Sequence, residues 1–177
     1  MTSLVLVTGP PASGKTTLAV PLARLLDLPL VSKDVIKEAL FDSLGHGDRG
    51  SSRRLGAASF AVMLALLRHF PAAVAEAPFA PVAGPALLAI CPRPIEVFCR
   101  CPDHEVMRRY LARAGSRHPG HLDHQMAAEI RARLEGGAGP LGLGGPLLEV
   151  DTTQRVDVAA VAEWVSLQRE VVRPCQS

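Results

Sequence analysis

The residues with the clearest chemical pattern lie near the start of the chain. Residues 9–17 read GPPASGKTT, in which Gly9, Gly14, Lys15 and Thr16 fit the pattern G-x-x-x-x-G-K-[ST] in full. Glycines let successive backbone N–H groups turn inward at the start of a helix, where they form a concave anion site. The Lys15 ammonium can reach the β- and γ-phosphates of a nucleotide, and the Thr16 hydroxyl can ligate Mg²⁺. We therefore predict that this segment holds Mg·ATP. The predicted contacts are Gly9, Pro10, Pro11, Ala12, Ser13, Gly14, Lys15, Thr16 and Thr17.

Asp34 is the candidate for acid–base chemistry. It follows residues 28–32, which are predicted as the second strand, so it lies at the sheet edge where the first strand delivers the phosphate site. A carboxylate there can take the proton from an attacking hydroxyl. Asp34 can also cap the helix that follows it. Lys33 and Lys37 flank it and are candidate substrate contacts, although either can be an ordinary exposed helix lysine.

Basic residues mark a third region of interest. Arg109, Arg113 and Arg117 recur every four residues, so they share one face if a helix continues through them. Such a face is often only solvated. Three histidines follow at three-residue spacing: His118, His121 and His124. Because a Pro-Gly break separates the first histidine from the others, loop polarity explains them better than a metal site.

The pattern of apolar residues predicts the elements that must position these side chains. Strands are predicted at 4–8, 28–32, 72–77, 95–101 and 147–151. Helices are predicted at 15–26, 34–44, 53–70, 103–114, 122–134 and 156–170, with a short one from Gly84. Residues 46–52 and 136–146 are predicted as loops. Alternating strands and helices predict an α/β fold with a five-stranded, mainly parallel sheet flanked by helices. A chain of 177 residues fits a single domain, residues 1–177.

The composition narrows the class of partner. The net charge is +2 and aromatic residues make up 4% of the chain. Single-stranded nucleic acid is usually held by aromatic side chains in a basic groove, so a small partner is favoured over nucleic acid. No apolar run approaches the ~20 residues that span a bilayer, and the first residues do not resemble a signal peptide. We therefore expect a cytoplasmic protein without membrane contact. The four cysteines fit buried, reduced thiols better than a metal or redox pair.

The use of basic residues is uneven. Of 19 lysines and arginines only three are lysines, namely Lys15, Lys33 and Lys37. The excess of arginine, with abundant alanine, glycine and proline, is typical of GC-rich coding DNA. Lysines that are kept against this bias are candidates for chemistry, and all three lie in the first 37 residues.

Four motifs occur in order over nearly the whole chain: GPPASGKTT, LPLVSKDVIKEAL, VFCRCPDHEVMRRYLARAGSRHPGH and LLEVDTT. In this combination the chain resembles the AAA-type P-loop kinase-like family that groups with chloramphenicol phosphotransferase, zeta toxins and the kinase domain of polynucleotide kinase. The resemblance implies a P-loop NTPase fold, like that of nucleoside kinases, with a small arginine-bearing lid at about residues 109–122. It implies that Asp34 is the general base and that Arg109 stacks on adenine. It also implies that Arg113 and Arg117 approach the phosphates as charge moves.

The same resemblance assigns less specific sites. The backbone that would border the adenine comprises Asp151, Thr152 and Thr153. Asp151 or Thr153 can equally cap the last helix. Glu76 stands where the family usually has an aspartate, and it can hold a Mg²⁺-bound water, contact substrate or end the strand in solvent. Arg53 and Arg54 lie where such folds receive their acceptor.

Together these features predict an ATP- and Mg²⁺-dependent phosphotransferase whose acceptor is a hydroxyl of a metabolite or antibiotic. The predicted catalytic residues are Lys15, Asp34, Arg113 and Arg117. One alternative is a polynucleotide 5′-hydroxyl kinase, which would need a basic track beyond the ATP site. Another is an ATP-binding switch module that hydrolyses ATP slowly. The sequence leaves open whether the protein is a monomer or a homodimer.

Overall fold

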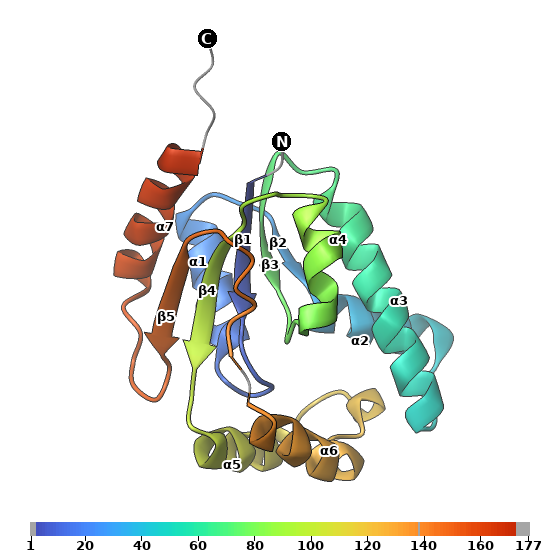
Figure 1. The fold of residues 1–177 in the computed structure, drawn as a ribbon. Coiled ribbons are helices and arrows are strands. Elements are labelled where there is room, and N and C mark those ends of the chain that lie inside the picture. The colour runs from blue at the N-terminus through green and yellow to red at the C-terminus, as the bar shows by residue number, and fades with distance from the viewer. Residues whose placement is uncertain (1–2, 138, 173–177) are drawn as a thin grey trace.

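A five-stranded parallel sheet forms the centre of the computed structural model, which describes residues 3–137 and 139–172. The strands lie in the order β2-β3-β1-β4-β5, and every pairing between neighbours is parallel (Figure 1). Their bounds are β1 Ser3–Thr8, β2 Leu30–Ser32, β3 Ala72–Glu76, β4 Ile95–Arg100 and β5 Leu147–Asp151. The predicted α/β class and the parallel sheet are confirmed.

Helices cover both faces of this sheet and its carboxyl edge. Figure 1 shows α1 and α7 on one side, α3 and α4 on the other, and α5 and α6 across the end to which the strand arrows point. The α-helices are α1 Lys15–Leu25, α2 Lys33–Leu44, α3 Arg49–Leu67, α4 Gly84–Leu88, α5 Asp103–Arg113, α6 Asp123–Glu135 and α7 Val158–Val172. Two short 3₁₀ turns are η1 Pro81–Ala83 and η2 Pro119–His121. No helix in the described part of the chain is both long and apolar enough to cross a bilayer.

The apolar run in β1 is explained by burial on both faces. Val5 and Val7 belong to the cluster that packs under α1 and α7. Leu4 and Leu6 belong to the cluster on the opposite face, under α3 and α4. Because successive side chains of a strand point to opposite faces, a central parallel strand needs apolar residues at every position.

The register brings the ends of three strands to one edge. Ser32, the last residue of β2, pairs with Glu76, the last residue of β3. Glu76 also pairs with Val7 of β1, one residue before that strand ends. The loop after β1, the start of α2 and the Glu76 carboxylate therefore lie close together, at the edge where ligands bind in open parallel sheets.

The start of α3 differs from the sequence-based prediction. The helix begins at Arg49 and not at Arg53, so half of the predicted loop at 46–52 is helical. The Asp48 side chain accepts a hydrogen bond from the Ser51 N–H and caps the first turn. An aspartate at this position satisfies a helix N–H that otherwise lacks a partner.

The packing of α1 yields a stability prediction. Leu22 is fully buried in the cluster between the sheet and α7, whereas Leu25 of the same helix is 59% exposed. Leu22→Ala should lower the free energy of unfolding by about 2–5 kcal/mol, because it removes apolar contacts and leaves a cavity. Leu25→Ala, the control, should change it by less than about 0.5 kcal/mol. Urea denaturation measures both variants, and equal losses would contradict this account of the core.

Candidate active site

The loop after β1 has the geometry of an anion cradle. Gly9 and Gly14 have φ angles of 136° and 87°, which side chains rarely adopt. A Cβ atom at Gly9 would lie 2.7 Å from the Cys99 carbonyl oxygen, so glycine is also needed for space. α1 begins directly after Gly14 without a side-chain cap, which leaves the N–H groups of its first turn to a ligand.

Buried polar groups of this loop face the same space. The Lys15 side chain is buried, and its Nζ donates to the Pro10 carbonyl oxygen at 2.6 Å. Burial lowers the pKa of Lys15, while Glu76 and Asp34 oppose that shift. Within the described residues, the buried Ser13 hydroxyl has no hydrogen-bond partner. A phosphate is an acceptor that satisfies both groups, so the cradle fits a nucleotide triphosphate.

Oxygen ligands gather beside the cradle. Glu76 is buried, and its carboxylate accepts hydrogen bonds from Thr16 Oγ1 at 3.3 Å and from Ser32 Oγ at 2.6 Å. The alternative that Glu76 ends its strand in solvent is therefore wrong. A carboxylate and two hydroxyls fit Mg²⁺, which commonly takes few protein ligands together with substrate phosphates. In keeping with such an open site, no group of three or more His, Cys, Asp or Glu side chains in the described segments could hold a metal alone.

Asp34 lies in the first turn of α2 and faces residues 109–122, the predicted lid. Ser32 occupies the N-cap position and Asp34 makes no capping bond, so the helix-cap interpretation of Asp34 is wrong. Its Oδ2 accepts a hydrogen bond from Arg117 at 2.8 Å. Burial acts to raise the pKa of Asp34, but Arg117 and His121 outweigh it and the net pKa lies below the ordinary value. The carboxylate is therefore ionised near neutral pH.

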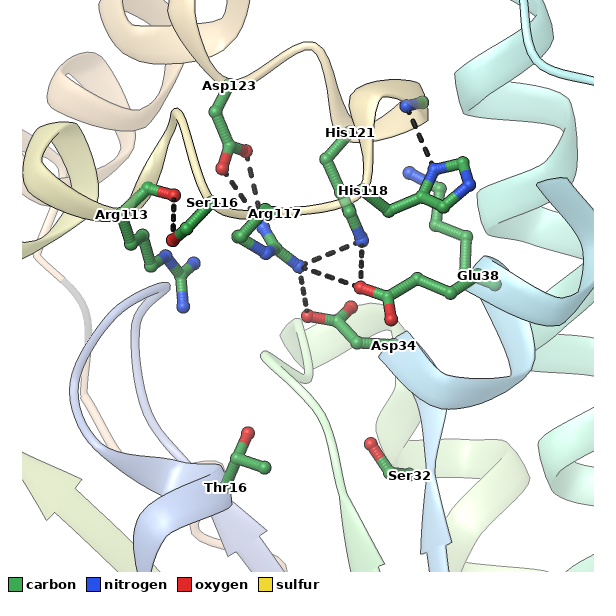
Figure 2. A network of polar contacts seen from close by, with 12 residues as sticks. Thr16, Ser32, Asp34, Glu38, Arg113, Ser116, Arg117, His118, His121 and Asp123 are labelled. Atoms are coloured by element: carbon green, nitrogen blue, oxygen red, sulfur yellow. Dashed lines mark hydrogen bonds and ion pairs between the residues drawn. The ribbon is translucent and has the colours of Figure 1, made fainter. Parts of the chain in front are cut away.

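Arg117 connects the lid to α2. Figure 2 shows its guanidinium between Asp34 and Glu38 on one side and His121 and Asp123 on the other. It lies 3.2 Å from the buried Asp123 carboxylate, 3.0 Å from His121 Nε2 and 4.0 Å from Glu38. The resemblance predicted this arginine near the phosphates, and the structure places it on Asp34. The Arg117 side chain is only 16% exposed, but its charge remains paired because three carboxylates surround the guanidinium.

Arg113 is the lid arginine with an unmet donor. It lines the main cavity, and its guanidinium lies 5.6 Å from the Tyr110 ring centre. Its buried Nε has no hydrogen-bond partner among the described residues. Burial, followed by the nearby Arg117, lowers the pKa of Arg113. A guanidinium in this position is ready to pair with an incoming phosphate.

Arg109 joins α5 to the segment after β5. Its Nε donates to Glu105 at 2.6 Å and its second nitrogen to the Thr152 carbonyl oxygen at 3.0 Å. Asp151 binds the N–H and hydroxyl of Thr153, which stabilises a local turn. A cavity of about 320 Å³ lies between α1 and the segment after β5. Its lining comprises Gly14, Thr17, Leu18, Arg109, Thr152, Gln154, Arg155, Val156 and Val158. These residues place the predicted adenine-bordering backbone beside the cradle.

The main cavity, about 710 Å³, brings most of the predicted residues together. From the sequence-predicted set its lining includes Pro11, Ala12, Gly14, Lys15, Thr16, Thr17, Lys33, Asp34, Lys37, Glu76, Arg109, Arg113 and Arg117. Arg53 and Arg54 are not brought to it. They are exposed on α3, where Arg53 pairs with Glu129 and Arg54 donates to Ser51.

The lid docks on α2 through a close aromatic contact. A Cβ atom at Gly120 would lie 2.7 Å from the Phe41 ring, which also stacks on His118. His121 is buried and lies 2.8 Å from Glu38, so loop polarity does not describe it, whereas His124 is exposed. Burial is the main cause that lowers the pKa of His121, and the charge of Arg117 lowers it further. The hydrogen bond with Glu38 opposes this shift.

Sequence reasoning missed several residues of this site. Glu38, Asp123 and Tyr110 were not singled out, although Tyr110 donates to Asp123 at 3.1 Å and helps to hold Arg117. Glu38 lies one helical turn after Asp34, a spacing that places both carboxylates on one face of α2. That spacing was a usable signal. Asp123 offered none, because only the fold brings it beside Arg117.

The Gly120–Phe41 contact gives a prediction about the lid. Gly120→Ala should force η2 away from α2 and destabilise the docked lid by about 1–3 kcal/mol, because the new methyl overpacks the Phe41 ring. Gly115→Ala is the matched control, since nothing lies within 4 Å of a Cβ atom there. Hydrogen exchange of residues 114–123 measures the effect. Equal exchange in both variants would show that this contact does not hold the lid.

The Arg117–Asp34 pair predicts the titration of Asp34. The pKa of its carboxyl should lie below the ordinary 3.8 in the wild type and should rise in Arg117→Gln, where burial acts with less opposition. Because the folded-state pKa is the lower one, the pair stabilises the fold above about pH 4, and this stabilisation is lost as pH falls through the folded-state value. Carboxyl ¹³C shifts report the pKa directly. Arg108→Gln is the control, and an unchanged Asp34 pKa in Arg117→Gln would refute the pairing.

Comparisons with known proteins bear on the family and the fold of the chain. Residues 4–136 match the family model of an AAA domain. A "putative kinase" from Chloroflexus aurantiacus j-10-fl is 37% identical, with a TM-score of 0.79 over 94% of this chain and 97% of its own. A gluconokinase from Sinorhizobium meliloti 1021 is 18% identical, with a TM-score of 0.59 over 94% and 96% of the two chains. A shikimate kinase from Acinetobacter baumannii, in complex with shikimate, is 17% identical, with a TM-score of 0.55 over 99% and 97%.

These findings differ in what they establish. A comparison with curated protein sequences gives no significant match. The gluconokinase and the shikimate kinase share the fold alone at their low identity. The family model covers more than half of the chain, and the 37% identical relative covers nearly all of it. The chain belongs to the AAA-domain family of P-loop, kinase-like proteins.

Proposed function

We propose that this protein transfers the γ-phosphoryl group of Mg·ATP to a hydroxyl of a small molecule. The observation that carries the proposal is one cavity of about 710 Å³ that is lined by both the Lys15 cradle and the Asp34 carboxylate. A phosphate site alone would suit any nucleotide-binding protein. A carboxylate that lines the same cavity as the cradle adds the proton acceptor that a kinase needs.

Each residue of the cavity has a distinct part in this transfer. The Gly9–Thr17 amides and Lys15 would bind the triphosphate, and Arg113, whose Nε has no hydrogen-bond partner among the described residues, would pair with its terminal end. Thr16 and Glu76 would hold Mg²⁺, which when bound neutralises charge on the phosphates. These groups fix the phosphoryl group at the cradle end of the cavity.

Asp34 would position the acceptor and receive its proton. Arg117 donates a hydrogen bond to Oδ2 of Asp34, and within the described residues Oδ1 makes no hydrogen bond. A carboxylate can accept at both oxygens, so Oδ1 is available to an acceptor hydroxyl. As the hydroxyl oxygen forms its bond to the γ-phosphorus, its proton passes to Asp34, and the bond to the leaving ADP oxygen breaks.

The size and the closure of the site support a small acceptor. A volume of about 710 Å³ lies within the range of small-molecule sites. The lid is attached to α2 through Arg117 and the Gly120–Phe41 contact, so the acceptor side is covered. The relative at 37% identity is described as a "putative kinase", which agrees with the proposed phosphoryl transfer.

The role of Asp34 can be tested by an isosteric change. Asp34→Asn should reduce phosphoryl transfer by ~10²–10⁴-fold and leave the affinity for ATP nearly unchanged, because it removes the proton acceptor and keeps the shape. Asp42→Asn, on the same helix but 73% exposed, is the control. Transfer from γ-labelled ATP measures turnover, and unchanged turnover in Asp34→Asn would refute the assignment.

A second variant separates binding from chemistry. Lys15→Ala should abolish productive nucleotide binding, because it removes the ammonium that reaches the β- and γ-phosphates. Isothermal titration with a non-hydrolysable ATP analogue measures this loss. An unchanged affinity would show that the nucleotide binds elsewhere.

A further inference from the structure

The three lysines of the chain converge on the main cavity. Arginine supplies 16 of the 19 basic residues, yet Lys15, Lys33 and Lys37 all line this one space. Lysine differs from arginine in that its charge is compact and its three donors can turn toward a ligand. Lys15 belongs to the phosphate cradle, which leaves Lys33 and Lys37 to be explained.

Neither Lys33 nor Lys37 forms an ion pair within the described residues. They lie one turn apart on α2, and both are half-buried. Among the described residues Lys33 makes no hydrogen bond or ion pair, and no carboxylate lies within 4.0 Å of Lys37. The Lys37 ammonium donates only to the neutral Ser52 hydroxyl, at 3.0 Å, and lies 5.1 Å from the Phe41 ring centre. Asp34, whose charge raises the pKa of both lysines against the effect of burial, is itself paired with Arg117.

Two partly buried ammonium groups without ion pairs cost free energy unless an anion binds to them. Burial lowers the pKa of both Lys33 and Lys37, so the folded chain alone disfavours their charged forms. A partly desolvated ammonium with unmet donors is stabilised when a negative group pairs with it. The energetic gain from such a ligand would therefore be larger here than at an exposed lysine pair.

The lining of the cavity is positively charged overall. It holds seven lysines and arginines and three carboxylates, a surplus of four positive charges. Glu105, which pairs with Arg108 and Arg109, and Glu38, which lies 4.0 Å from Arg117, stand outside the lining and reduce the effective surplus to two. Mg·ATP carries a comparable negative charge, so the positions of Lys33 and Lys37, and not the total charge, indicate a second anion.

The sheet order separates the two lysines from the nucleotide. The cavity beside Thr152 and Val156 lies at the β5 edge, whereas α2 follows β2 at the opposite edge. β1 and its phosphate cradle lie between these two edges. A nucleotide that extends from the β5 side to the cradle thus ends before α2, so Lys33 and Lys37 face the acceptor end of the cavity.

We infer that the acceptor is an anionic hydroxy compound, whose carboxylate or phosphate ester pairs with Lys33 and Lys37 while its hydroxyl faces Asp34. The inference rests on the proposed phosphoryl transfer and adds the chemical class of the acceptor. The two lysines are assigned to binding this anion, and neither takes part in the proton transfer.

The first experiment identifies the charge of the acceptor. A metabolite extract is divided by anion exchange at neutral pH, and each fraction is incubated with the protein and γ-labelled ATP. Labelled product should form from the retained, anionic fraction. Labelled product from the unretained fraction alone would overturn the inference. Absence of product from both fractions would count against the proposed transfer, and anion binding is then decided by the second experiment.

The second experiment measures anion binding without turnover. The cradle is saturated with Mg²⁺ and a non-hydrolysable ATP analogue, and the unfolding midpoint is followed against glycolate, inorganic phosphate or neutral ethylene glycol at constant ionic strength. One of the two anions should raise the midpoint, which separates a carboxylate site from a phosphate site, and ethylene glycol should not. Equal responses to anions and ethylene glycol, or no response, would overturn the inference.

Variants connect that response to the two lysines. Lys33→Gln and Lys37→Gln should each weaken the affinity for the stabilising anion by about tenfold or more, the usual effect of losing a hydrogen bond to a charged group. Affinity for the ATP analogue should stay unchanged. Arg68→Gln is the control, because this exposed arginine directly follows α3 and does not line the cavity. Wild-type anion affinity in both lysine variants would contradict the assignment.

Discussion

The shared carboxyl edge of β1, β2 and β3 is the constraint on which the site depends. Parallel strands end at the same side of a sheet, and here the register pairs Glu76 with both Ser32 and Val7. The cradle after β1, Asp34 after β2 and the Glu76 carboxylate are therefore neighbours although they lie far apart in sequence. Burial on both faces explains the apolar residues 4–7 of β1, and this packed strand fixes the position of the cradle that follows it.

Electrostatics then determines how the lid meets this edge. The Arg117 guanidinium forms ion pairs with Asp34 of α2 and with Asp123 of α6. Removing water strengthens each of these attractions and also raises the cost of any group left unpaired. Arg117 is paired on several sides, whereas the buried Nε of Arg113 has no partner among the described residues (Figure 2).

The sequence predicted the parts of this protein that depend on local pattern. The strands and the sheet class follow from the apolar runs, and these predictions are confirmed. The phosphate loop follows from glycine spacing and stays a prediction. The start of α3 was misplaced because Gly50 and two serines concealed the Asp48 cap. The burial of Glu76 and the pairing of Arg117 with Asp34 could not be predicted, because they depend on side-chain directions and on residues 83 positions apart.

A crystal structure with Mg²⁺ and a non-hydrolysable ATP analogue tests the central claim most directly. The account predicts that the triphosphate lies within the amides of residues 9–17 and that Asp34 faces its terminal phosphorus. The space between them should admit a hydroxyl oxygen about 3–3.5 Å from that phosphorus. A triphosphate outside the loop, or an Asp34 carboxylate directed away from it, would contradict the account.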